Sequence, residues 1–448
     1  MSYTNMPLSV ETLLKHLPQQ QPLWLALSGG LDSMVLLHLL SQSGLNVKAI
    51  HVNHQLSVYA RQWQDHCQLA CDKLAVELVV KVVDVMPEGR GLEDAARQAR
   101  FAAFSQCLAP DSVLLTAHHR DDQAETLLLR LLRGAGVHGL RGMLPVSPLL
   151  IEGRVRGQII RPLLGCSRAE LALYARQHQL DWVTDDSNAD TSLDRNFLRH
   201  KVLPTMAQRW HGFTQRWSAT ASHLAEAAEL LDELAAQDLN TLPQAAELDK
   251  FGSSLSLAFV QRFSAPRAKN LLRYWLAGLD LALTSAQLTQ LLDQLSHARA
   301  DAQVDVQVAN RHLRRYQGRV FCTQELAPTP EVAVELGPNQ PIQFGGGVVA
   351  MRSAAYGLAL PTSGKWLVRA RAQGERSHPA GRAHSQALKK LLQDVNLPPW
   401  LRNQLPLVCD GQVVLAVGDL WLEQSAGDLI PNGYLLTWEI PQISHSNA

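Results

Sequence analysis

The chain has 448 residues, with 41 basic and 41 acidic side chains, and 46% of its residues are hydrophobic. This length is too great for one hydrophobic core and predicts two or three domains. The charge balance excludes a uniformly basic nucleic-acid binder. No apolar run reaches membrane-spanning length and no signal-peptide pattern opens the chain, so we expect a cytoplasmic protein. The six cysteines are scattered, which fits reduced thiols better than a disulfide framework.

The first half of the chain alternates short apolar segments with helical patterns. Such alternation predicts an α/β fold with a doubly wound parallel sheet, in which ligands bind beyond the carboxyl ends of the strands. The expected strands are Leu23–Leu27, Val47–Val52, Glu77–Val83, Val113–Ala117 and Arg156–Leu163. The expected helices are Met34–Leu40, Gln62–Leu74, Leu92–Leu108, Asp122–Arg133 and Ser167–Gln177.

A Gly-rich hexapeptide lies between the first strand and the first helix. Its glycines let the backbone approach a phosphate, and the amides at the helix N-terminus point at the anion. Asp32 adds a carboxylate, which suits a polyphosphate mainly through a bridging cation such as Mg²⁺. An ordinary helix cap is the simpler alternative, but the whole hexapeptide favours phosphate binding, and it is not a Walker loop. The expected phosphate-binding residues are Ser28, Gly29, Gly30, Leu31, Asp32 and Ser33.

A second polar motif, His118–Thr126, follows the fourth strand. Asp122 and Glu125 are three residues apart and share a helix face. Acidic residues in a first helical turn also suit the helix dipole, so capping is the alternative. This many titratable side chains at a strand end favours a site. The candidate residues of this motif are His118, Asp121, Asp122 and Glu125.

Two pairs of arginines are candidates for anion binding. Arg97 and Arg100 are one helical turn apart, and Arg195 and Arg199 also share a helix face. For Arg97 and Arg100 a solvated helix face is an equally good interpretation.

The second half has a different pattern. Residues 218–240 predict one long amphipathic helix, and 271–295 predict two helices with a break near Leu283. After residue 330 glycine, proline and β-branched residues increase, which predicts strands and turns around one helix at Ser385–Val395. Between Lys365 and Arg402 there are eight basic and two acidic residues. We therefore expect a catalytic domain at 1–217, a helical domain at 218–330 and a mixed α+β domain at 331–448, whose basic segment suits phosphates.

The hexapeptide resembles the signature of the PP-loop ATP pyrophosphatase family. More motifs, in order and spacing, resemble the tRNA(Ile)-lysidine synthetase family, and the resemblance covers nearly the whole chain. Phe101 stands where that family often has Tyr, a mild departure. The motifs that carry the resemblance are Ser28–Ser33, Gly91–Phe101, His118–Thr126, Arg161–Leu164, Asp186–Asn188, Arg195–Arg199, Leu388–Asp394, Pro398–Arg402 and Pro406–Val408.

The resemblance implies a tRNA-modifying ligase that uses ATP and binds tRNA through its last domain, 331–448. It would adenylate the first anticodon cytidine of a CAU-anticodon isoleucine tRNA and join free lysine to it, giving lysidine, AMP and pyrophosphate. The residue chemistry fits: Asp32 and Asp122 would hold Mg²⁺, and the four arginines would neutralise phosphate charge. His118, Asp121 and Glu125 are the candidates to deprotonate lysine. A PP-loop tRNA thiolation enzyme and a non-catalytic ATP- and RNA-binding module are the alternatives, and a homodimer is left open.

Overall fold

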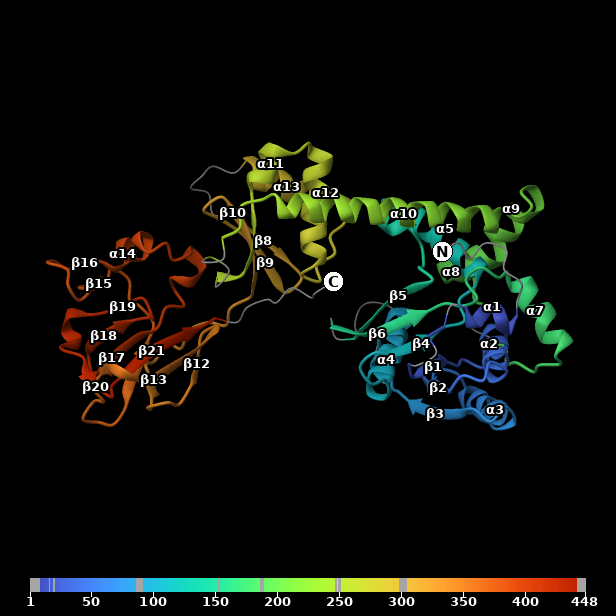
Figure 1. Ribbon diagram of the computed structural model, residues 1–448, viewed down its shortest axis with the longest axis horizontal. Coiled ribbons are helices and arrows are strands. Elements are labelled where there is room, and N and C mark those ends of the chain that lie inside the picture. Colours follow the sequence, from blue (N-terminus) through green and yellow to red (C-terminus); the bar gives the residue numbers. More distant parts are fainter. Residues whose placement is uncertain are drawn as a thin grey trace. The chain divides into compact units, whose positions relative to one another are not determined.

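The computed structural model describes residues 9–15, 17–18, 21–85, 92–151, 154–185, 189–245, 248, 251–297 and 304–440. The Asp186–Asn188 motif lies outside the described residues. The chain divides into two compact units, Met1–Leu234 and Ala235–Ala448 (Figure 1). This division does not decide the three domain boundaries expected from the sequence, which stay a prediction.

The N-terminal unit is built on a six-stranded sheet with the order β3-β2-β1-β4-β6-β5. The first five strands in that order are parallel, and β5 pairs antiparallel with β6 at the edge. The doubly wound parallel sheet is therefore confirmed, with an edge strand that the sequence pattern does not reveal. The strands are β1 (Leu23–Ala26), β2 (Val47–Asn53), β3 (Glu77–Val82), β4 (Ser112–Leu115), β5 (Val146–Ile151) and β6 (Arg154–Ile160).

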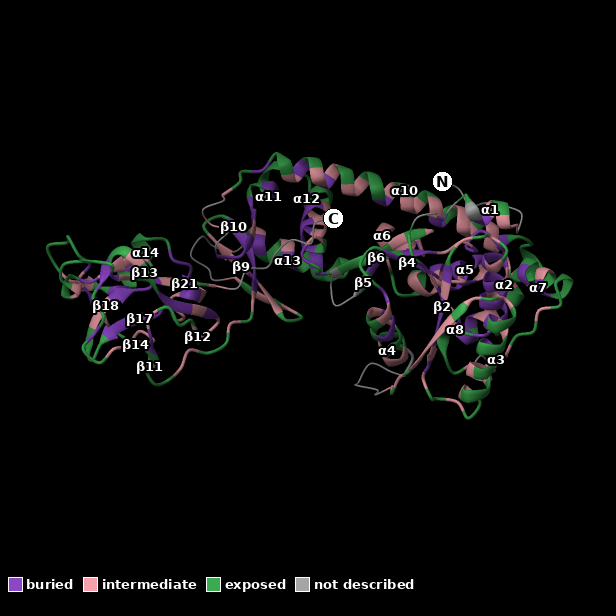
Figure 2. Cartoon of the chain, turned by 60° about the horizontal axis from the view of Figure 1, so that its bottom comes forward, coloured by how far each residue is buried: buried purple, intermediate pink, exposed green. Residues whose placement is uncertain are grey.

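Helices cover both faces of this sheet, and the central strands are buried (Figure 2). One core cluster contains most of the apolar side chains of α2 and residues of α3 and α7, and a smaller one contains Phe104 of α4 with Ile50 and Leu114. Burial on both faces explains why β1 and β4, in the middle of the sheet, read as nearly continuous apolar runs, Leu23–Ala26 and Ser112–Leu115. The helices are α1 (Val10–Leu14), α2 (Leu31–Ser41), α3 (Ala60–Lys73), α4 (Leu92–Cys107), α5 (Arg120–Leu132), α6 (Val137–Leu140) and α7 (Arg168–Gln177).

Three further helices complete this part of the chain. The predicted amphipathic helix at 218–240 is confirmed as the end of a longer helix, α10 (Phe213–Asn240), in which Ala221, Ala228 and Ala235 are buried at a seven-residue spacing. Before it come α8 (Asp194–Phe197), a π-helical turn at Leu198–Val202 and α9 (Leu203–Arg209).

The C-terminal unit begins with helices packed on an antiparallel sheet of order β7-β10-β9-β8. The two helices predicted at 271–295 are confirmed as α12 and α13, with the break where expected. The sheet is not among the expected elements, because β8 is half exposed and β9 is rich in arginine, so neither has an apolar run. The elements are β7 (Ser253–Ser256), α11 (Ala258–Arg262), α12 (Ala265–Ala277), α13 (Ser285–His297), β8 (Asp305–Val308), β9 (Arg311–Tyr316) and β10 (Arg319–Gln324).

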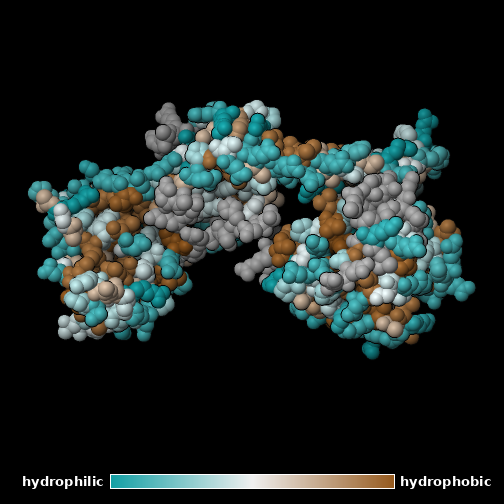
Figure 3. Space-filling model, in the orientation of Figure 1, coloured by the Kyte–Doolittle hydropathy of each residue, from teal (hydrophilic) through white to brown (hydrophobic). Residues whose placement is uncertain are grey.

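The rest of the C-terminal unit is rich in strands, with one α-helix among its described residues, α14 (Leu388–Asp394). This helix is shorter than the predicted Ser385–Val395, because Gln386–Ala387 pairs with Arg376–Ser377 instead. The surface seen in Figure 3 mixes hydrophobic patches with hydrophilic residues over these strands. The strands are β11 (Val334–Leu336), β12 (Ile342–Phe344), β13 (Gly347–Leu358), β14 (Trp366–Arg369), β15 (Arg376–Ser377), β16 (Gln386–Ala387), β17 (Leu407–Asp410), β18 (Val413–Val417), β19 (Trp421–Leu422), β20 (Ile430–Pro431) and β21 (Tyr434–Glu439).

Candidate active site

The Gly-rich hexapeptide forms a tight turn between β1 and α2. Gly29 has φ +83°, and a Cβ there would lie 2.9 Å from the Sγ of Cys67, so only glycine fits this position without strain. The hydroxyls of Ser28 and Ser33 lie 3.0 Å apart, and Ser28 Oγ accepts a hydrogen bond from the Gly30 amide. The turn thus presents hydroxyls and the N-terminus of an 11-residue helix at the carboxyl edge of the sheet.

The His118–Thr126 motif forms the N-terminus of α5, directly after β4. His119 is the cap: its Nδ1 accepts the Asp122 amide, and its own amide donates to Asp122 Oδ2. The capping alternative considered from the sequence for the acidic residues is therefore correct for Asp122, and the cap residue itself, His119, was not predicted. It does not exclude a site, because the His119 side chain also reaches Asp32 of the hexapeptide.

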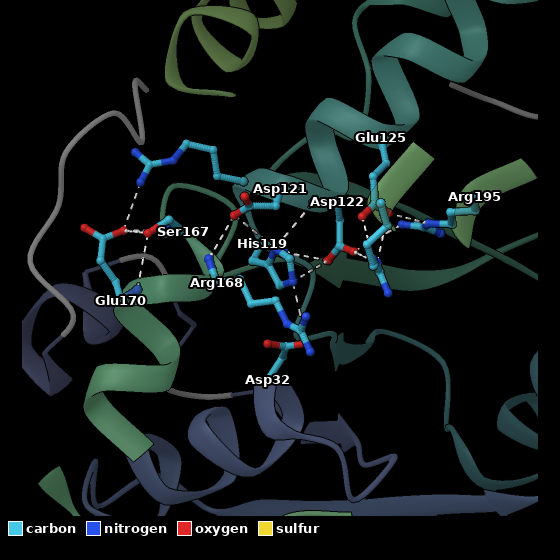
Figure 4. Close-up of polar contacts among 11 residues, drawn as sticks. Asp32, His119, Asp121, Asp122, Glu125, Ser167, Arg168, Glu170 and Arg195 are labelled. Atoms are coloured by element: carbon cyan, nitrogen blue, oxygen red, sulfur yellow. Dashed lines mark hydrogen bonds and ion pairs between the residues drawn. The ribbon is translucent and has the colours of Figure 1, made fainter. Parts of the chain in front are cut away.

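His119 lies between the carboxylates of Asp32 and Asp122 (Figure 4). Its Nε2 is 3.6 Å from Asp32 Oδ2 and 3.4 Å from Asp122 Oδ2. Burial alone would lower the pKa of His119, but the surrounding carboxylates outweigh it and raise the pKa. Burial would raise the pKa of Asp122, but the charges of His119 and Arg195 hold it below its ordinary value. The strands β1 and β4 are neighbours, so the fold brings together two motifs about 90 residues apart.

A second set of ion pairs extends from Asp122 along α5. Glu125 is 1% exposed and accepts hydrogen bonds from both Arg195 and Arg199. Both guanidinium groups also reach Asp122 Oδ1, at 3.3 Å and 3.0 Å. The two arginines expected as an anion clamp are therefore already paired with carboxylates, and their charge is largely compensated within the protein.

The other residues of the motif have separate partners. Asp121 Oδ2 accepts the Arg168 amide at the start of α7. His118 Nδ1 lies 2.9 Å from Thr116 Oγ1, and burial is the main cause that lowers the pKa of His118 to about 4. His118 is therefore neutral at pH 7.

Three family models match the chain. A PP-loop domain matches residues 3–206, a TilS substrate binding domain matches 255–321, and a TilS substrate C-terminal domain matches 367–431. The tRNA(Ile)-lysidine synthase of Serratia proteamaculans is 39% identical over 91% of this chain and 93% of its own length. The enzymes of the same name from Pseudomonas putida and Shigella flexneri are 40% and 36% identical, over 94% and 96% of this chain and 96% and 98% of their own lengths.

This chain belongs to the tRNA(Ile)-lysidine synthase family. It is therefore a tRNA-modifying ligase with a PP-loop ATP-binding domain, and the sequence-based assignment is confirmed. No helix within the described residues has the length and apolar character needed to cross a membrane.

For this lysidine synthase family member, the other arginine pair lies elsewhere on the N-terminal unit. Arg97 and Arg100 are on α4, where the Arg97 guanidinium lies 5.0 Å from the centre of the Phe101 ring. Arg100 Nε donates to His54 Nε2 over 3.4 Å. His54 was not predicted as a site residue. It directly follows β2, however, and in parallel sheets ligands bind beyond the carboxyl ends of the strands, so its position could have indicated a site.

The fit of Mg²⁺ to Asp32 and Asp122 can be judged from how their oxygens are used: Asp122 Oδ1 accepts hydrogen bonds from Arg195 and Arg199, and Oδ2 accepts one from the His119 amide. Asp32 Oδ1 is buried and has no hydrogen-bond partner among the described residues. The same part of the chain holds no group of three or more His, Cys, Asp or Glu side chains arranged as metal ligands. Mg²⁺ in nucleotide sites commonly uses only one or two carboxylates together with phosphates and water. Asp32 therefore fits a nucleotide-associated magnesium ion, whereas Asp122 would have to share its oxygens between the ion and its present donors.

Proposed function

We propose that this chain joins free lysine to the first anticodon cytidine of an isoleucine tRNA with a CAU anticodon, using ATP. The observation that carries the proposal is the approach of Asp32, in the phosphate-binding turn, and Asp122, at the N-terminus of α5, to within 3.6 Å and 3.4 Å of His119 Nε2. Two helix N-termini and two carboxylates at one edge suit a polyphosphate with its cation. The relatives named above bear the name of this activity.

The reaction has two steps. The 2-keto oxygen of cytidine attacks the α-phosphorus of ATP, and the bond to the β-phosphate oxygen breaks to release pyrophosphate. The ε-amine of lysine then attacks C2, the C2–oxygen bond breaks, and AMP leaves. The amine loses its proton to a base during this second step.

Asp32 and Asp122 would hold Mg²⁺ against the phosphates, where the ion would neutralise charge on the leaving pyrophosphate. Ser28, Ser33 and the amides of the turn would donate hydrogen bonds to the phosphate oxygens. Arg195 and Arg199 hold the carboxylates of Asp122 and Glu125 in place and are proposed to act mainly through them. Arg97 and Arg100 remain proposed phosphate ligands, and the phosphates that they would bind are those of the RNA substrate rather than those of ATP.

The three base candidates differ in how far their acceptor atoms are free. Both Glu125 oxygens accept from arginines, so Glu125 is the least available. His118 has Nε2 left after its contact with Thr116, but its low pKa makes it a weak base. Asp121 keeps one oxygen beside the one that accepts the Arg168 amide. All three stay candidates for the proton acceptor.

The test is mass analysis of the anticodon nucleoside after incubation with unmodified tRNA, ATP and isotopically labelled lysine. We expect a labelled nucleoside heavier than cytidine by lysine minus water, together with AMP and pyrophosphate. A product that requires a sulfur donor would favour the thiolation alternative. Binding of ATP and tRNA with no pyrophosphate release would favour the non-catalytic module.

A further inference from the structure

A row of arginines crosses the carboxyl edge of the N-terminal sheet. Arg97 and Arg100 are one turn apart in the middle of α4, and Arg161 directly follows β6. Helix α4 packs against β5, and Arg161 Nη1 donates a hydrogen bond to Ser147 Oγ on that strand, so Arg161 belongs to the same part of the sheet as Arg97. Burial, and then the charges of Arg97 and Arg130, lower the pKa of Arg161 to about 10. At the other end, Arg100 contacts His54, which directly follows β2.

The structure holds each of these side chains in place. The guanidinium of Arg97 lies over the Phe101 ring, and Arg161 Nη1 donates to the carbonyl oxygen of Leu144 and to Ser147 Oγ, at 2.6 Å and 3.0 Å. Arg100 donates to His54 Nε2. Burial and the neighbouring charge of Arg100 lower the pKa of His54 to about 4, so His54 is a neutral acceptor at pH 7. A neutral ring can orient Arg100 without repelling it.

These three arginines differ from Arg195 and Arg199 in their charge balance. Within the described ranges, Arg97, Arg100 and Arg161 have no carboxylate within ion-pair distance, whereas Arg195 and Arg199 share two. Arg97 and Arg100 are also exposed. The edge therefore presents uncompensated positive charge to whatever binds there, which is the electrostatic condition for a phosphate-bearing ligand.

We propose that Arg100, Arg97 and Arg161 bind successive phosphodiester groups of the RNA strand beside the nucleotide that is modified, with His54 as the positioning residue for Arg100. This inference rests on the proposed function for its choice of RNA. The RNA backbone would run along the carboxyl edge of the N-terminal sheet, past Arg100, Arg97 and Arg161 in that order.

The length of the row favours RNA over the triphosphate of ATP. In the sheet order β2 and β6 are separated by three strand-to-strand steps, which is roughly 14 Å at the usual spacing. The triphosphate has only two bridging oxygens between its terminal phosphorus atoms and is much shorter. ATP phosphates also have their own donors in the turn at Ser28–Ser33. The Arg97 guanidinium lies over the Phe101 ring. Aromatic rings and guanidinium planes are surfaces on which unstacked RNA bases stack, so this pair also favours RNA.

The test compares two binding measurements that need no turnover. Arg97→Gln, Arg100→Gln and Arg161→Gln are measured singly for binding of an unmodified CAU anticodon stem-loop over a salt series, and for binding of ATP without RNA. Arg176→Gln is the matched control, because Arg176 is an exposed arginine on α7 of the same unit. We expect each row variant to weaken RNA binding about tenfold and to reduce the salt slope by about 0.7, the value for one lost single-strand phosphate contact. ATP affinity and the control should stay within about twofold of wild type.

The role of His54 is tested with two variants of different chemistry. His54→Gln keeps an acceptor and should retain most of the RNA affinity, whereas His54→Leu should lose as much as Arg100→Gln, with no further loss in the double variant. An unchanged RNA salt slope in all three arginine variants would overturn the proposal. So would a fall in ATP affinity without a change in RNA binding, which would assign the row to ATP. If wild type bound RNA but formed no lysidine, the proposed function would fail while this test still gave its answer.

Discussion

Arg199 forms a bidentate ion pair with the buried carboxylate of Glu125, donating from Nε to Oε1 at 2.6 Å and from Nη2 to Oε2 at 2.9 Å. Nη2 also reaches Asp122 Oδ1 at 3.0 Å. Burial would lower the pKa of Arg199, but the carboxylates outweigh it and raise the pKa. The pair between Arg199 and Glu125 joins the segment after α8 to α5. The same guanidinium also holds Asp122, the carboxylate that is proposed to bind Mg²⁺.

Replacing Arg199 should affect both stability and turnover. Arg199→Ala leaves Glu125 buried with only Arg195, which should destabilise the protein by about 3 kcal/mol, since breaking a buried pair strands a charge. At saturating tRNA the turnover number should fall at least tenfold, because Asp122 loses its orientation. Arg267→Ala is the control: Arg267 pairs with buried Asp238 in a similar fork, away from the proposed site. The control should lose stability and keep turnover, and an equal loss of turnover in both variants would contradict the assignment.

Two adjacent glycines of the phosphate-binding turn should respond differently to alanine. At Gly29 the backbone is left-handed and a Cβ would lie 2.9 Å from Cys67 Sγ and 3.1 Å from Val183. At Gly30 the nearest atom would be Ser28 Oγ at 3.5 Å, an ordinary contact. Gly29→Ala should therefore weaken ATP binding more than tenfold and cost about 1–3 kcal/mol of stability. Gly30→Ala should cost much less stability. Thermal unfolding measures the stability of both variants, and ATP titration measures their affinity for ATP. Equal stability losses would show that the turn is not strained.

Asp32 can be tested without disturbing the fold. Asp32→Ala removes a carboxylate that is about a third exposed and has one oxygen without a partner. We expect normal unfolding behaviour and no AMP formation, because the phosphate charge loses its cation. The readout is AMP release over a Mg²⁺ titration. Turnover at the wild-type rate and with the wild-type Mg²⁺ dependence would remove Asp32 from the site.

The N-terminal fold and the grouping of Asp32 with Asp122 were predictable, because strand and helix periodicity fixes which residues follow strands. The pairing of Arg195 and Arg199 with Glu125 was not, since a helix-face spacing says nothing about which charge faces it. Capping by the acidic residues could be weighed but not decided from the sequence, and the cap formed by His119 was not predicted. The arginine-rich strand β9 and the half-exposed β8 escaped prediction because a polar strand has no apolar run.

His118 should make the N-terminal unit sensitive to acid. Its pKa is about 4 in the folded protein against an ordinary value of 6.5, so below pH 6.5 the unfolded chain binds a proton that the folded chain does not. Stability is therefore complete above pH 6.5 and falls as the pH drops toward 4, by up to about 3 kcal/mol. Urea unfolding without Mg²⁺ at several pH values would measure it, and His118→Gln should flatten this part of the profile. An identical slope in the variant would assign the acid sensitivity to other groups.

Lys389 and Lys390 should bind the tRNA body away from the anticodon. Several other cations of the 365–402 segment have partners: Lys365 pairs with Glu335, Arg369 with Glu375, and Arg371 donates to Asn403. The two lysines are exposed and, among the described residues, form no ion pair. Lys389→Ala with Lys390→Ala should weaken binding of full-length tRNA and reduce its salt slope by between about one and two. The reason is that each phosphate contact releases counterions when it forms, so a complex with fewer contacts releases fewer of them. ATP affinity should not change, and Lys365→Ala, which removes a cation that is already paired, should have a smaller effect on tRNA binding. If the double variant keeps the wild-type salt slope, these lysines belong to a solvated surface and the tRNA body is bound elsewhere.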